Sequence, residues 1–210
     1  MKIIFMGNSE IACPILNALK KSKHQILSVV SNSPKALGRG MTYQYTPVGK
    51  LANKLDLQLK LIPYDTPGEI ADDAENDNWD ICNIGAEPQR AEKINFSAAY
   101  AEIQATYLIP PNSKLQNISE VDKTGNKIAV ASRTAYGLWL ERNIHNAELI
   151  QVEGVGNSFD VFLNENLDAL AGLRPALIDD VEKIPGAKIL EGQFMSVQQA
   201  IGTVSYTHLR

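Results

Sequence analysis

Short apolar runs alternate with amphipathic segments along most of this chain, and this alternation limits its fold more than any other feature. The first run, residues 2–6, ends at Gly7, which is typical of a buried parallel strand that closes in a turn. Ser9 then provides a helix N-cap before apolar residues at helical spacing, and a second apolar run follows at residues 26–30. Strand, helix and strand at this spacing predict a βαβ unit with a right-handed crossover.

The same rhythm continues to about residue 200 and predicts an α/β fold. Further helices are expected at 47–55, 67–75, 134–143, 158–164 and 175–183, and strands at 57–62, 80–84, 103–109, 127–131, 148–152, 168–171 and 187–190. Residues 32–45 and 85–95 are expected to be polar connections, and a final amphipathic piece is expected around 196–200. We place the seam between two lobes near 100–110, with a second crossing near 190–195.

The charge and cysteine content narrow the class of protein. The 20 Lys and Arg residues are spread along the 210-residue chain and are outnumbered by 24 Asp and Glu, for a formal net charge of -4. This balance argues against a nucleic-acid binder, because phosphate neutralisation needs a concentrated basic surface. Two cysteines, Cys13 and Cys82, cannot form a disulfide framework, and we interpret both as buried hydrophobic residues. No zinc-type spacing of Cys and His is present, so we expect neither a metal nor a cofactor.

Two features of the sequence concern its compartment. No apolar run approaches the roughly 18 residues that a membrane-spanning helix needs, so we expect no membrane insertion. The sequence passes from Met1 and Lys2 directly into a strand, without the charged and apolar regions of a signal peptide. As written, the chain is expected to stay in the cytoplasm.

The first 50 to 60 residues carry several motifs in a specific order. A strand, a glycine turn, a helix from Ser9 and a second strand are followed by Gly38-Arg39-Gly40 and by the helix start Thr46-Pro47-Val48. In this order the motifs closely resemble the opening of methionyl-tRNA formyltransferase. The resemblance implies that the Gly-Arg-Gly loop approaches the acceptor end of the initiator tRNA, with Arg39 contacting a phosphate or a base.

The rest of the chain departs from that family. Its members use an Asn-x-His segment, a Ser-Leu-Leu-Pro turn after it and a later Asp to polarise the formyl carbonyl and move the amine proton. We interpret residues 60–210 as lacking this catalytic set, with His24 and His145 outside it, and Met41-Thr42 replace the lysines expected after the loop. We therefore expect a chain that is not an enzyme, with a formyltransferase N-terminal fragment lacking its catalytic residues as the alternative.

A second pattern covers roughly residues 60–202. A strand from Trp79 leads into a small-residue loop, Pro88-Gln89-Arg90 and then Phe96-Ser97 ahead of Tyr100. This is similar to the family 3 solute-binding proteins of ABC importers, which often take polar amino acids. The similarity continues through 127–136, 167–175 and 194–202. It implies a two-lobed, type 2 periplasmic-binding-protein-like α/β fold, an ABC permease as partner and a place outside the cytoplasm.

Together, the two resemblances predict a chimera-like organisation. Residues 1–60 form a Rossmann-like βαβ segment that completes lobe 1, residues 61–100 and 191–203 supply the remainder of lobe 1, and residues 101–190 form lobe 2. Residues 204–210 resemble a translated sequencing-adapter tail, which we exclude from fold reasoning. We expect a monomer that binds a small molecule. A fused reading frame with no evolved function remains an open interpretation.

The expected ligand site follows from charge. A small zwitterion needs a fixed cation for its carboxylate, and the planar guanidinium of arginine provides two parallel donors. Arg90 is the candidate, and the alternative is an arginine on a surface loop. Thr134 begins a helix after a strand and is expected to present its hydroxyl and nearby N–H groups to the same carboxylate. Plain helix capping is its other role, and the two are compatible.

The partner of a ligand ammonium is less defined. Asn83 and Gly85 stand where the family offers hydroxyl or backbone acceptors to that group. The family's usual Asp after the strand at 167–171 is replaced here by Gly172-Leu173-Arg174. Either the ligand has no ammonium at this point or Glu87 takes over, and Arg174 suits a ligand with a second anionic group.

Overall fold

The computed structural model describes residues 1–31, 35–37, 42–57, 62–76 and 78–204, and divides into two compact units, Met1–Pro63 and Tyr64–Arg210. The predicted α/β class is confirmed in both units. None of the helices in these ranges has both the length and the apolar character that a membrane crossing requires.

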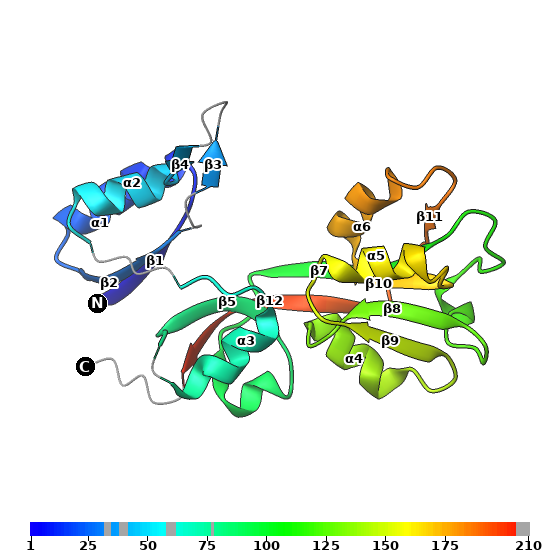
Figure 1. Cartoon of the computed structure of the whole chain (residues 1–210). Helices are drawn as coiled ribbons and strands as arrows, with labels where there is room; N and C mark the ends of the chain where they lie inside the picture. The colour runs from blue at the N-terminus through cyan, green and yellow to red at the C-terminus, as the bar shows by residue number, and fades with distance from the viewer. Residues whose placement is uncertain (32–34, 38–41, 58–61, 77, 205–210) are drawn as a thin grey trace. The chain divides into compact units, whose positions relative to one another are not determined.

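The first unit is built around the predicted βαβ motif. Strands β1 (Lys2–Met6) and β2 (Gln25–Val30) pair in parallel, and the connection between them holds η1 (Glu10–Ala12) and α1 (Cys13–Lys21). Helix α2 (Pro47–Lys54) lies on the same side of the strands as α1 (Figure 1). Thr46 caps α2 by accepting the N–H of Gly49. The buried core of this unit, within the described residues, is small: Phe5, Leu16, Val29, Val48 and Ala52.

The described residues 35–37 and 42–44 form strands within the range 32–45, where the sequence predicted a polar loop. Strand β3 (Lys35–Leu37) pairs antiparallel with β4 (Thr42–Gln44). Backbone hydrogen bonds stabilise such a short pair without an alternation of apolar side chains, so hydrophobic periodicity could not reveal it. The predicted strand at 57–62 lies partly outside the described residues, since residues 58–61 are not described.

The second unit has one sheet with the strand order β5-β12-β7-β10-β8-β9, with β11 added to β7 and β6 to β12. The strands are β5 (Ile81–Ala86), β6 (Ile94–Phe96), β7 (Ala101–Ile109), β8 (Lys127–Ala131), β9 (Glu148–Val152), β10 (Ala169–Leu173), β11 (Lys188–Ile189) and β12 (Met195–Val204). Strand β8 is parallel to β9 and β10, whereas β7 runs antiparallel to β10 and β12. The final amphipathic piece is therefore part of the ten-residue strand β12.

Helices cover both faces of the part of the sheet formed by β7, β8 and β10 (Figure 1). The helices of the unit are α3 (Pro67–Asp72), α4 (Ala135–Asn143), α5 (Asn157–Asn164) and α6 (Arg174–Val181), with short 3-10 turns η2 (Asp73–Glu75), η3 (Arg90–Glu92) and η4 (Ile118–Glu120). Tyr107 and Ile128 pack with Leu140 of α4, whereas Leu108 and Leu170 pack with α5 and α6. Because successive strand residues point to opposite faces, this part of the sheet is buried on both sides.

Candidate functional site

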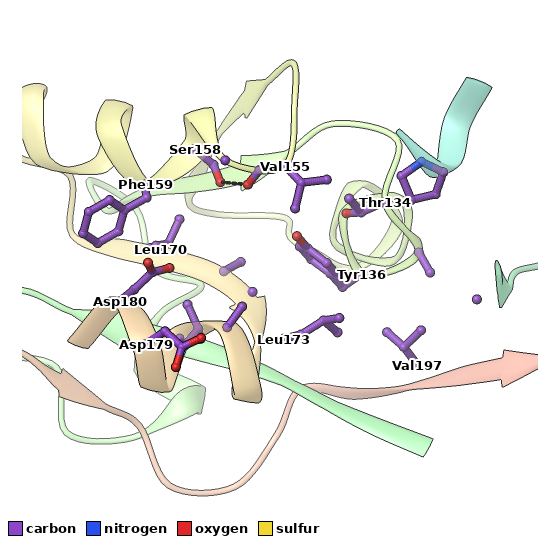
Figure 2. Close-up of a pocket in the computed structure, with 18 of the residues that line it drawn as sticks. Thr134, Tyr136, Val155, Ser158, Phe159, Leu170, Leu173, Asp179, Asp180 and Val197 are labelled. Atoms are coloured by element: carbon purple, nitrogen blue, oxygen red, sulfur yellow. Dashed lines mark hydrogen bonds between the residues drawn. The ribbon is translucent and has the colours of Figure 1, made fainter. Parts of the chain in front are cut away.

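A cavity of about 650 Å³ lies in the second unit, where several elements end or begin. Figure 2 shows side chains that enter it from the starts of α4 and α5, from β10 and from α6. Strands β8 and β10 run in parallel, and both end near this cavity. Ligands of α/β proteins commonly bind beyond the carboxyl ends of parallel strands, and this cavity has that position. Its volume falls within the usual range for small-molecule sites.

Arg90 lines the cavity and is 4% exposed. Its Nη1 donates to the carbonyl oxygen of Gly85 at 2.7 Å, and its Nη2 donates to that of Arg133 at 2.8 Å. A guanidinium has five N–H donors, so these two bonds hold the group in place and leave donors for a ligand. Burial lowers the pKa of Arg90, and the negative charge of Glu87 opposes that shift. The result is a fixed cation at the cavity wall.

Gly85 positions Arg90, because it allows β5 to pack closely and its carbonyl accepts a hydrogen bond from the guanidinium. A Cβ on Gly85 would lie 2.8 Å from Cγ1 of Val197 and 3.2 Å from Cβ of Ala135, so a side chain there would collide with β12 and with the start of α4. Only glycine lets β5 approach these elements so closely. Gly85 is also a cavity residue, and its carbonyl is the acceptor that orients Arg90.

Thr134 lies at the same cavity and acts as the N-cap of α4. Its hydroxyl accepts the N–H of Gly137 at 3.0 Å and donates to the carbonyl of Ala131 at 2.9 Å. The hydroxyl is therefore engaged in the capping role considered from the sequence. The first turn of α4 carries the positive end of the helix dipole, which favours an anion at this wall.

Arg133, the residue before Thr134, connects the start of α4 with α3. Arg133 has a left-handed backbone with φ of 59°, and its carbonyl accepts from Arg90. Its own Nη2 donates to the carbonyl of Gly68 at 3.1 Å and to Oδ1 of Asp72 at 2.6 Å. This turn thus links α3 to the start of α4 through side-chain bonds.

The other candidates lie outside the lining of this cavity. Asn83 is exposed on β5. Glu87 is buried, with Oε1 2.5 Å from Nη1 of Arg142 and Oε2 accepting the N–H of Gln89 at 2.8 Å. Arg174 donates from Nε to Oε1 of Gln104 at 2.7 Å and from Nη2 to the carbonyl of Gly192. Arg39 lies outside the described residues. Their roles in binding stay predictions.

Sequence reasoning missed the residues that α5 and α6 contribute. Phe159 and Asp160 come from α5, Asp179 and Asp180 come from α6, and Lys183 follows α6. Nζ of Lys183 lies 2.7 Å from Oδ1 of Asp180 and 4.8 Å from the centre of the Phe159 ring. These residues share no motif. The start of the helix after the strand at 148–152 could have indicated Phe159 and Asp160, but Asp179, Asp180 and Lys183 lie at the end of α6 or after it, where no local signal marks them.

The described part of the chain has neither a candidate metal site nor the full set of formyltransferase motifs. It contains no group of three or more His, Cys, Asp or Glu side chains arranged to hold a metal ion. Asn143-Ile144-His145 does have Asn-x-His spacing, which our sequence analysis overlooked, although no Ser-Leu-Leu-Pro turn follows it. Asn143 donates from Nδ2 to the carbonyl of Trp139 at 2.7 Å, and the backbone N–H of His145 donates to Asp122. Both residues are exposed and do not line the cavity.

The chain is similar in sequence to methionyl-tRNA formyltransferases. No protein-family model matches the chain. The methionyl-tRNA formyltransferase of Anaplasma marginale is 38% identical over 77 residues, which is 37% of this chain and 24% of that protein. The enzyme of Acidiphilium cryptum is 26% identical over 218 residues, which covers 98% of this chain and 65% of that protein. The chain spans about a quarter of the length of the first of these relatives.

The solved structures that resemble this chain carry a different description. The "substrate binding protein of an amino acid ABC transporter" has a TM-score of 0.65 at 16% identity, covering 99% of this chain and 87% of that one. Holo ArgBP from T. maritima has a TM-score of 0.63 at 13% identity, covering 97% of this chain and 83% of that one. At these identities the likeness shows the fold alone. The double resemblance and the type 2 periplasmic-binding-protein-like α/β fold, both predicted from the sequence, are confirmed.

Proposed function

We propose that the second unit binds a small carboxylate ligand, an amino-acid-like molecule or a polar acid, in the cavity beside Arg90. The observation that carries this proposal is an arginine that is only 4% exposed, whose guanidinium is held by two backbone carbonyls on a cavity of about 650 Å³. A buried cation with donors to spare is costly without an anion, and a carboxylate offers two matching acceptors. The start of α4 adds favourable electrostatics on the same wall.

We further propose that the unit closes around its ligand as a solute-binding module. Strands β7 and β12 cross the predicted seam between the lobes, and they are the natural place for a hinge. The bonds from Arg90 to Arg133 and from Arg133 to Gly68 and Asp72 would hold the closed form, because they join elements on the two sides of the cavity. An ABC permease as partner and the predicted lobe boundaries belong to this same proposal.

A thermal-shift screen of the 210-residue chain with amino acids and small carboxylic acids tests the proposal. A ligand at about 100 times its Kd should stabilise the folded state by about 2.7 kcal/mol. Arg90→Ala should remove this shift, and Arg90→Lys should keep only part of it, because lysine retains the charge but loses the paired donors. The matched control is Lys127→Ala, which removes an exposed cation of the same unit that does not line the cavity.

Each variant is compared with its own unliganded melting temperature, so a change of stability does not mimic a change of binding. If Arg90→Ala keeps the full ligand shift of the unmodified chain, Arg90 is not the anchor. If no carboxylate shifts the melting temperature at all, the binding proposal fails.

A second candidate function rests on the formyltransferase matches, which reach 46% identity over 59 residues in the protein from Syntrophomonas wolfei. A formyl-transfer assay on charged initiator tRNA tests it. We expect no transfer, because the Ser-Leu-Leu-Pro turn is absent from the sequence and Asn143 and His145 lie outside the cavity. Formyl transfer above the level of a no-protein control would favour the enzyme over the binding module.

A further inference from the structure

The lining residues next to Arg90 are uncharged. Gly85 lies beside the guanidinium, and Val197 and Ala135 pack against Gly85. Tyr136, Leu173 and Val197 also line the cavity, and Figure 2 shows them on the side of Thr134. None of these residues carries a charge. Gln199 also lines the cavity and pairs with Gly85 in the β5–β12 ladder, so a ligand held by Arg90 would meet carbon and an uncharged amide next to its carboxylate.

The acidic side chains of the cavity gather elsewhere. Asp160, Asp179 and Asp180 come from α5 and α6 and lie around Lys183, whose ammonium is bonded to Asp180. The bond to Asp180 is the main cause of the raised pKa of Lys183, and the charges of all three carboxylates add to it. Figure 2 shows Asp179 and Asp180 on the side of Phe159, away from Thr134. Consistent with that position, none of the three carboxylates contributes to the pKa of Arg90.

Glu87 is the one carboxylate, among the described residues, whose charge acts on Arg90. It does not line the cavity, and both of its oxygens have partners within the fold, Arg142 and the N–H of Gln89. Glu87 is thus engaged in holding the loop after β5 to α4. It is not placed to accept an ammonium from a ligand in the cavity.

Position 172 offers no carboxylate either. Gly172 lies near the end of β10, and a Cβ there would stand 2.9 Å from Cδ2 of Leu177. Leu177 is 2% exposed and fills this part of the wall. A side chain at position 172 would have to displace Leu177, so the wall is closed by carbon where an acid would otherwise reach the ligand.

In an α-amino acid the ammonium sits on the carbon next to the carboxylate. Bound to Arg90, such an ammonium would be buried against an uncharged wall without a counter-charge, which is costly. We infer that, of the two ligand classes in the proposed function, this cavity takes the acid: a carboxylic acid without an α-ammonium group. This inference rests on the proposed function, since it names the ligand class of the same site.

Two matched pairs of probes test the inference by calorimetry on the full chain. The pairs are 3-phenylpropanoate with phenylalanine and 4-methylpentanoate with leucine, and each pair differs only in the α-ammonium. We expect the acid without the ammonium to bind about tenfold more tightly or better in at least one pair, because the buried ammonium is unpaired. Equal or tighter binding of the amino acids would overturn the inference and leave the proposed function intact.

Failure of all four probes while another α-amino acid binds through Arg90 would also overturn the inference. Failure of every carboxylate would overturn the proposed function with it. The two ideas are therefore separated by the same set of titrations.

A gain-of-charge variant sharpens the test. Leu173 lines the cavity near the end of β10, so Leu173→Asp adds a carboxylate to the uncharged wall. The preference for the acid over the amino acid should fall about tenfold in this variant, because the ammonium gains a partner. Leu173→Asn has nearly the same shape without the charge and should keep the original preference. An unchanged preference in a folded Leu173→Asp chain would contradict the inference, and the probe pairs test it even if that variant fails to fold.

Discussion

The two units of this protein show the same alternation of strands and helices in sequence, but they use their strands differently. In the first unit β1 pairs with β2, its next strand in the chain, and two helices lie on one side of that pair. In the second unit β7 lies between β12 and β10, which begin more than 60 residues later in the chain. The alternation thus builds a minimal βαβ motif in the first unit. In the second unit it builds one sheet in which strands distant in the sequence lie next to each other.

This difference in strand pairing determines how many apolar side chains each unit buries. A two-stranded sheet is marginal in water unless helices pack on it, and the first unit has a single cluster of five buried side chains among its described residues. The second unit has clusters on both faces of its sheet. The pairing of strands that are distant in the sequence therefore provides both the larger core of the second unit and the strand ends that surround the cavity.

The largest expected effects come from truncating each core. Leu16 in the first unit and Leu108 in the second are both fully buried, and changing either to Ala should cost about 2–5 kcal/mol of local stability. Both tryptophans, Trp79 and Trp139, belong to the second unit, so their fluorescence during urea unfolding reports that unit alone. Leu108→Ala should lower the tryptophan midpoint, whereas Leu16→Ala should leave it unchanged and alter only the far-ultraviolet circular dichroism. A tryptophan midpoint that falls equally in both variants would break the comparison, because the units would then unfold together.

A middle-sized effect is expected from the helix caps, which are chemically the same in the two units. Thr46 accepts the N–H of Gly49 and Thr134 accepts that of Gly137, each at 3.0 Å. Replacing either threonine with Ala should cost about 0.5–2 kcal/mol, with Ser restoring most of the loss. Only Thr134→Ala should move the tryptophan midpoint. A shift of similar size from Thr46→Ala would show that the first unit supports the second.

The smallest expected change in the free energy of unfolding comes from lowering the pH. Asp122 accepts the backbone N–H groups of Asn146 at 2.7 Å and Ala147 at 2.8 Å. Burial alone would raise the pKa of Asp122, but these N–H donors and that of His145 lower it overall. Because the folded pKa is lower, Asp122 adds stability above the ordinary Asp pKa of about 3.9, and this is lost as pH falls towards the folded pKa.

Asp122→Asn should therefore flatten the loss of stability of the second unit below about pH 4, measured from urea midpoints of tryptophan fluorescence. Asp56→Asn in the first unit is the matched control and should leave those midpoints unchanged. An identical acid profile for Asp122→Asn and the unmodified chain would mean that this carboxylate adds nothing to the stability of the second unit.

Local signals predicted most of the elements. The strands at 127–131 and 148–152 match β8 and β9, and Thr134 caps the helix expected after the first of them. The short strand β6 was missed because three residues, Ile94-Asn95-Phe96, are too few to show an alternation clearly. Its pairing with β12, about 100 residues away, is a tertiary contact that the local sequence does not specify.

For the candidate site, too, some features follow from the local sequence and others only from the tertiary structure. The sequence by itself determined the types of the elements and the cap at Thr134, because periodicity and capping are local properties, and it proposed Arg90 as a cation for a carboxylate. Only the tertiary structure decided that Arg90, Gly85 and Thr134 share one cavity while Glu87 turns to Arg142 and Arg174 to Gln104. A charged side chain takes the partner that packing brings within reach, and that partner is set by strand order across the sheet rather than by its neighbours in the chain.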